Sequence, residues 1–149
     1  MKKKLSLLLA LLMLTSIAAL AACSKVEPIT VKVVINVAEE DDRGRREVTE
    51  TILETDFAYE SSTPTLNDLL VKLRDAGKIN LVTEADGDNV IITGINDLVP
   101  KTDETETTME DYDWYVYIND GDAEDNSLSS TKAIAANDTV TITYMHYSI

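Results

Sequence analysis

The sequence TLNDLLVKL, residues 65–73, decides the fold of this chain. Its leucines, continued by Ala76, recur at the three- and four-residue spacing that places apolar side chains on one face of a helix. Thr65 with Asp68 resembles a capping box, and Gly77 suits the helix end. A helix of about three turns is too short to be stable alone in water, so we expect it to pack on a sheet.

On both sides of this helix, apolar and polar residues alternate with the period of a strand. We predict strands at residues 29–37, 48–59, 79–85, 89–99, 114–119 and 139–147, with a bulge near Ile52. Residues 101–113, which include six acidic side chains, and residues 120–130 predict polar loops. The order of strand, strand, helix and several strands is that of the β-grasp. We therefore expect an α+β fold, a β-grasp-like mixed sheet with one amphipathic helix packed on one face.

The amino terminus has the pattern of an export signal. Three lysines at residues 2–4 precede an apolar stretch that ends in small residues directly before Cys23. This segment resembles the lipobox of bacterial lipoproteins, which implies a diacylglycerol on Cys23 and cleavage before it. A plain secretory signal, with Cys23 as a leftover thiol, is the alternative. The expected organisation is a signal peptide at 1–22, a lipidated cysteine and tether at 23–28, and one domain at 29–149.

A lipid on Cys23 would hold the protein at the cell membrane, on the extracytoplasmic side. The chain carries a formal net charge of −14, which repels nucleic acid and anionic headgroups, so we expect no nucleic-acid partner. An acidic surface can also gather Ca²⁺, and Asp120, Asp122 and Glu124 form a weak candidate site. The spacing does not match an EF-hand, and a solvated hairpin loop is the favoured alternative.

Residues for catalysis are scarce. His146 is the single histidine, Cys23 is the single cysteine, and no glycine-rich phosphate loop or Cys/His metal motif is present in the sequence. We therefore expect a protein that is not an enzyme and needs no cofactor.

Four segments, taken in order, resemble the transcobalamin-like C-terminal domain: residues 65–73, 92–97, 114–121 and 137–144. Asp97 and Asp120 stand where this family usually has glycine, Asn137 replaces a turn glycine, and Ile142 stands where tryptophan is common. In cobalamin carriers the domain caps the corrinoid from one side while a separate helical domain holds the rest. The resemblance thus implies the β-grasp-like fold and makes cobalamin a candidate ligand.

Strand alternation places Tyr115 and Tyr117 on the face opposite Trp114, with Asn119 at the end of the same strand. Tyrosine rings with polar tips suit a ligand or a partner, so these three residues are the predicted binding site. The alternative is a surface pair stabilised by cross-strand threonines. The chain is therefore predicted to be a lipid-anchored, non-catalytic binding module. It would capture a small molecule, with a corrinoid as one candidate, near a transporter, or dock to another surface protein through this face or a free sheet edge.

Overall fold

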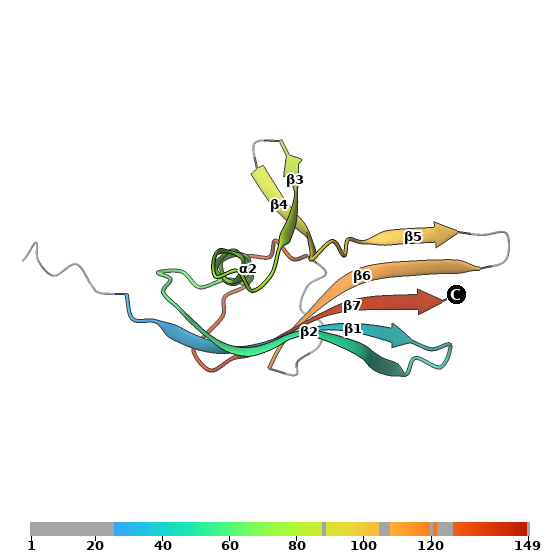
Figure 1. The fold of residues 1–149 in the computed structure, drawn as a ribbon, viewed down its shortest axis with the longest axis horizontal. Helices are drawn as coiled ribbons and strands as arrows, with labels where there is room; N and C mark the ends of the chain where they lie inside the picture. Colours follow the sequence, from blue (N-terminus) through green and yellow to red (C-terminus); the bar gives the residue numbers. More distant parts are fainter. Residues whose placement is uncertain (1–25, 88, 105–107, 120, 122–126, 149) are drawn as a thin grey trace, which may run out of the picture.

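The computed structural model describes residues 26–87, 89–104, 108–119, 121 and 127–148. Most of this part of the chain is sheet, and the single helix within it is short (Figure 1). The elements are β1 (Ile29–Glu40), β2 (Arg46–Tyr59), α2 (Leu66–Asp75), β3 (Leu81–Asp86), β4 (Asn89–Ile95), β5 (Lys101–Glu104), β6 (Met109–Ile118) and β7 (Thr139–Ser148). The α+β prediction is confirmed.

The main sheet has five strands in the order β2-β1-β7-β6-β5. β1 and β7 pair in parallel at its centre, whereas the outer pairs are antiparallel, so the sheet is mixed. β3 and β4 form a separate two-stranded sheet, which rises on the side of the main sheet that carries α2 (Figure 1). The predicted bulge is present, because Leu53 and Thr51 face consecutive residues of β1 and leave Ile52 as the extra residue.

The helix forms as its sequence predicts. The Thr65 side chain accepts a hydrogen bond from the Asp68 backbone N–H at 3.2 Å. At the other end Gly77 has φ 67°, and the Lys78 N–H donates to the Leu73 carbonyl at 2.9 Å, a Schellman arrangement. The helix buries its leucine face in one core with β1 and β7, through Leu66, Leu69, Leu70, Leu73, Val31, Val33, Ile35, Val140 and Ile142.

The prediction of polar loops at residues 101–113 and 120–130 was wrong in part. Lys101 to Glu104 form β5, which pairs with a β6 that begins at Met109 rather than at Trp114. Charged side chains are acceptable there because β5 is an edge strand and all four of its residues are exposed. In the second segment Leu128 is buried in the core. Beside it Ser129 accepts a hydrogen bond from the Ile92 N–H, which satisfies part of the free edge of β4.

One buried tyrosine should make stability depend on alkaline pH. Burial and the nearby Asp68 charge raise the pKa of Tyr59 from its ordinary 10.0 to about 12. Because the folded state holds the proton more tightly than the unfolded state, this contribution is complete below pH 10 and is lost as the pH rises toward 12. We expect wild type to lose at most about 1.4 kcal/mol per pH unit in that window relative to Tyr59→Phe. Denaturant unfolding at several pH values measures the difference, and parallel pH profiles for the two proteins would contradict it.

The turn after β4 holds a residue in the left-handed region at a position where the resembled family has glycine. Asp97 has φ 70°. An alanine there would place its Cβ in a disfavoured conformation, whereas glycine adopts this φ without strain. We expect Asp97→Gly to be more stable than Asp97→Ala by about 1 kcal/mol. Equal midpoints of chemical denaturation for the two variants would refute this expectation.

Candidate functional site

The predicted tyrosine pair lies on the face of the sheet opposite α2. Trp114 and Val116 are buried in the core, so Tyr115 and Tyr117 point to the other side, where both are half-buried. Their direct cross-strand neighbours are threonines of β7. The Tyr117 hydroxyl accepts a hydrogen bond from Arg46 Nη1 at 2.7 Å, although these two residues are 71 positions apart.

We call the face of the main sheet opposite α2 the helix-free face. The protein's own side chains cover much of it. The Tyr115 ring meets the Tyr147 ring edge-on, with centroids 5.9 Å apart, and burial is the main cause that raises the pKa of Tyr147. By strand register the same face carries four buried residues, namely Asn36, Ala38, Thr143 and Met145. The two predicted tyrosines therefore take part in closing this face and are not freely exposed.

Asn119, the third predicted binding residue, joins β6 to β7. Its φ is 55°, its Nδ2 donates to Asp138 Oδ1 at 2.7 Å, and its Oδ1 accepts from the Thr139 N–H at 2.9 Å. Both ends of the side-chain amide thus serve the connection between strands. Asn119 therefore lies at the end of the sheet and takes no part in the hydrogen bond between Arg46 and Tyr117.

Several predicted residues lie outside the part that the structure describes: Cys23, Asp120, Asp122 and Glu124. Within residues 26–87, 89–104, 108–119, 121 and 127–148, no group of three or more His, Cys, Asp or Glu side chains is arranged to hold a metal ion. In the same ranges no helix has the length and apolar character needed to cross a membrane.

The main sheet extends past α2, and we call this extension the arm (Figure 1). It contains β5 and the parts of β6, β7, β1 and β2 around Tyr112, His146, Glu39 and Glu47. On the helix side of the arm the rings of Trp114, Tyr144, Tyr112 and His146 form a continuous aromatic ladder. Successive ring centroids lie 4.9, 5.9 and 4.3 Å apart, and the last pair is parallel within 3°. The ladder arises because Trp114 faces Tyr144 and Tyr112 faces His146 in the antiparallel register of β6 and β7.

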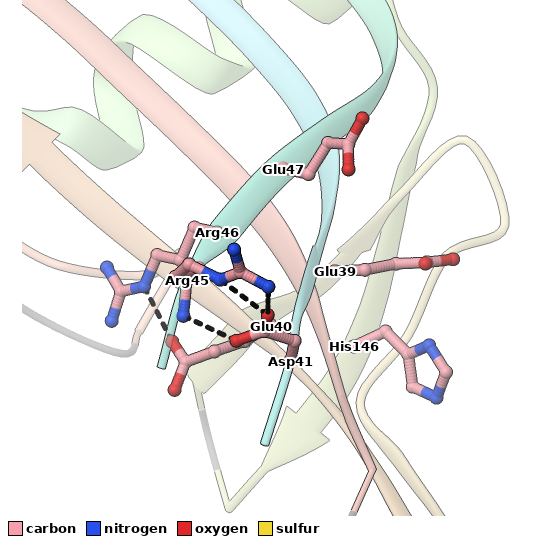
Figure 2. A pocket seen from close by; sticks show the side chains of 7 residues that line it. All are labelled: Glu39, Glu40, Asp41, Arg45, Arg46, Glu47 and His146. Atoms are coloured by element: carbon pink, nitrogen blue, oxygen red, sulfur yellow. Dashed lines mark hydrogen bonds and ion pairs between the residues drawn. The ribbon is translucent and has the colours of Figure 1, made fainter. Parts of the chain in front are cut away.

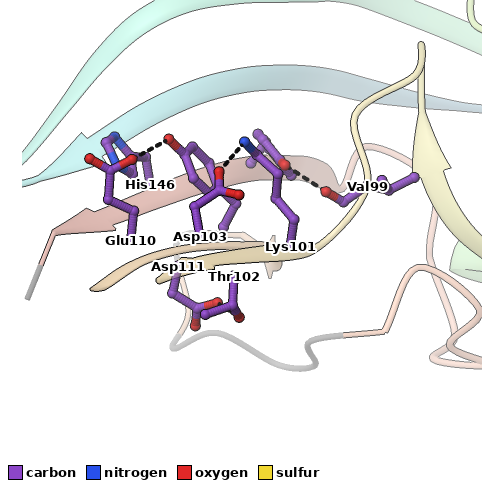
Figure 3. Close-up of polar contacts among 9 residues, drawn as sticks. Val99, Lys101, Thr102, Asp103, Glu110, Asp111 and His146 are labelled. Carbon is purple, nitrogen blue, oxygen red and sulfur yellow. Dashed lines mark hydrogen bonds and ion pairs between the residues drawn. The ribbon is translucent and has the colours of Figure 1, made fainter. Parts of the chain in front are cut away.

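Polar contacts fix the ladder at its sides. The Tyr144 hydroxyl donates to the Val99 carbonyl at 2.6 Å, and the Tyr112 hydroxyl donates to Glu110 at 3.2 Å. Lys101 Nζ lies 4.3 Å from the Tyr112 ring centroid and 2.6 Å from Asp103, whose carboxylate is the main cause that raises the pKa of Lys101. Figure 3 shows Lys101, Asp103, Glu110 and His146 on one side of the β5–β6 hairpin, with Thr102 and Asp111 on the other.

A hollow of about 530 Å³ lies at the end of the arm beside the ladder. It is lined by Glu39, Glu40, Asp41, Arg45, Arg46, Glu47 and His146 (Figure 2). Arg45 pairs with Asp41 at 2.6 Å and Arg46 pairs with Glu40 at 2.7 Å. Hydrogen bonds from the backbone N–H and the side chain of Arg45 lower the pKa of Asp41. Three lining side chains point to the opposite side of the strands from these two ion pairs, namely Glu39, Glu47 and His146 (Figure 2).

Comparison with known proteins gives little beyond this geometry. No family model matches the chain, and no curated protein matches it. Among solved structures it is similar to a protein from Ruminococcus gnavus ATCC 29149 described as "a putative metal binding protein". The two share 14% identity over 79% of this chain and 95% of that one, with a TM-score of 0.35. A similarity at this level carries no argument about the fold or the function.

Sequence reasoning missed the aromatic ladder as a surface. Residues 101–113 were interpreted as a loop because of their acidic side chains, although Glu110, Tyr112 and Trp114 continue the alternation of β6. His146 lies on the same face of β7 as Tyr144, two residues after it, as the alternation of a strand requires. Extending the period-2 pattern backwards from Trp114 would have found Tyr112.

Proposed function

We propose that this chain is a lipid-anchored, extracytoplasmic, non-catalytic binding module that docks to another protein at the cell surface. The observation that carries this proposal is the aromatic ladder on the arm, bordered by a wide hollow with charged walls. Small molecules are usually held in concave, mostly apolar pockets, whereas interfaces combine aromatic anchors with a polar rim. Tyr112 and His146 are half-buried and Tyr144 is buried, so the ladder is packed within the arm and partly open to a partner.

We also propose that the domain is β-grasp-like and of the transcobalamin-like C-terminal type. Its strand order supports this, since the first strand pairs in parallel with the last at the centre of the sheet. The four sequence segments occur in the expected order, and Asp97 and Asn137 adopt positive φ where the family has glycine. The anchor on Cys23 is supported by the sequence pattern before it.

One observation favours capture of a small molecule near a transporter as a second candidate function. Asn36 is 8% exposed, and its side-chain oxygen has no hydrogen-bond partner among the described residues. Register places Asn36 on the face of Tyr115 and Tyr117. A buried acceptor without a donor costs about 1–3 kcal/mol, which a ligand N–H could recover. The amide side chains of a corrinoid offer such donors.

Site-specific photocrosslinking in intact cells tests the docking proposal. A photoreactive phenylalanine analogue at Tyr112 or Glu47 should give a discrete protein adduct, because both positions face the arm surface. The same analogue at Glu54, an exposed residue of the opposite face, is the control and should give none. The absence of an adduct at both arm positions would overturn the proposal.

The small-molecule candidate and the anchor have their own tests. Calorimetry of the full chain in detergent with cobalamin and cobinamide should show saturable heat that is lost in Tyr117→Ala if the helix-free face holds a corrinoid; no heat would exclude that ligand.

Labelling of cells with a clickable fatty acid should mark wild type and not Cys23→Ser. Label on Cys23→Ser would contradict the anchor.

A further inference from the structure

We propose that the helix-side face of the arm recognises a cationic protein segment, with a lysine or arginine side chain seated between His146, Glu39 and Glu47. This inference rests on the proposed docking function, since it names the partner chemistry of that same surface. Three observations carry it. They are the order of side chains across the arm, the ammonium group of Lys101 that already lies on the Tyr112 ring, and the carboxylates of Glu39 and Glu47 that have no ion pair within the described ranges.

The strand register places one side chain from each strand in a single row across the arm. The row reads Lys101, Tyr112, His146, Glu39 and Glu47, from β5 through β6, β7 and β1 to β2. Neighbouring strands lie about 4.8 Å apart, so the row is roughly 20 Å long. An extended peptide segment crossing the strands could follow this row with alternate side chains facing it.

One end of the row shows how this surface holds an ammonium group. Lys101 Nζ lies over the Tyr112 ring at 4.3 Å and contacts the Asp103 carboxylate at 2.6 Å. A ring face and a carboxylate together are a favourable environment for an organic cation. The chain thus holds one cation on this row between a tyrosine ring and a carboxylate, and we assign the partner's cation to the other end, between the His146 ring and two carboxylates.

The other end of the row has a ring and carboxylates but no cation. His146 stacks on Tyr112 and lines the hollow. Glu39 and Glu47 are direct cross-strand neighbours, and neither has an ion pair within the described ranges. Like charges in such positions repel each other. The two arginines of the hollow are already paired with Asp41 and Glu40.

Charge and shape favour a cationic side chain of a protein over a metal ion. Among the described residues, no group of three or more His, Cys, Asp or Glu side chains is arranged to coordinate a metal ion. A lysine or arginine needs only one or two carboxylates and an adjacent ring, and the hollow of about 530 Å³ can admit its side chain. The net charge of −14 would steer a basic segment toward this protein.

Peptide titration tests the inference. Fluorescence anisotropy of the full chain in detergent would compare a short peptide carrying three alternate lysines with the same peptide carrying norleucine. We expect the lysine peptide to bind, and Glu39→Gln with Glu47→Gln to weaken it about tenfold, because both charge-assisted contacts are lost. Glu47→Lys should abolish binding, since it would supply the cation from within the chain. Circular dichroism checks that each variant is folded.

The matched control removes two charges elsewhere. Glu84→Gln with Asp86→Asn changes exposed acids of β3 and should alter the affinity less than twofold. Equal weakening by the two double variants would mean attraction to overall charge and would overturn the inference. Photocrosslinks at Tyr112 without any preference for lysine peptides would also overturn it while leaving the docking function in place. The loss of both signals would reject both proposals.

Discussion

Replacing Trp114 by alanine is expected to lower the free energy of unfolding by about 3–5 kcal/mol. Trp114 is 1% exposed and belongs to the core that contains the leucine face of α2. Its ring also begins the aromatic ladder, with its centroid 4.9 Å from that of Tyr144. The alanine variant would therefore leave a cavity at the point where the core meets the arm.

Trp114→Phe should cost much less than Trp114→Ala. The indole N–H is buried and has no hydrogen-bond partner among the described residues, so phenylalanine would lose volume but no hydrogen bond. Denaturant unfolding has to be followed by far-UV circular dichroism, because Trp114 is the single tryptophan of the chain. If the phenylalanine variant were as unstable as the alanine variant, the indole N–H would have to make a stabilising hydrogen bond, and this account would fail.

The helix could be predicted from sequence because its signals are local. Leucine spacing, the Thr65 cap and Gly77 all lie within one short segment, and the structure shows each in its expected role. Most strand positions followed in the same way from alternation, whereas β5 and the first half of β6 did not. The pairing of β1 with β7 joins segments that are about a hundred residues apart, and no local pattern fixes that register.

The candidate surfaces depended on features that sequence does not fix. β5 has little intrinsic strand preference, since it consists of Lys101, Thr102, Asp103 and Glu104, and it is a strand because β6 offers a free edge. Alternation correctly set the face of Tyr117, but its contact with Arg46 comes from distant strands of the sheet. The stacking of Tyr112 on His146 likewise required the register of β6 and β7.

Gly94→Ala is expected to have the second large effect, a loss of about 3 kcal/mol in the free energy of unfolding. A Cβ at this position would collide with the carbonyl oxygen of Leu98 and would lie 2.7 Å from Val99 Cγ1. The backbone there cannot easily move, because Ile95 and Leu98 exchange hydrogen bonds of 3.1 and 3.0 Å. Gly94 is thus needed for close approach of two backbone segments rather than for an unusual φ.

The same substitution should also weaken the arm surface. Val99 accepts the hydrogen bond of Tyr144, and Lys101 follows two residues later to lie over Tyr112. A displaced 98–99 backbone would move both contacts, so we expect Gly94→Ala to reduce lysine-peptide binding together with stability. Gly87→Ala is the matched control: Gly87 lies in the turn after β3, has φ 61° and has no atom within 4 Å of an added Cβ, so only backbone strain of about 1 kcal/mol is expected. If denaturation and peptide titration gave the same result for both variants, the close approach at Gly94 would not be what positions β5, and the arm would owe its geometry to strand pairing alone.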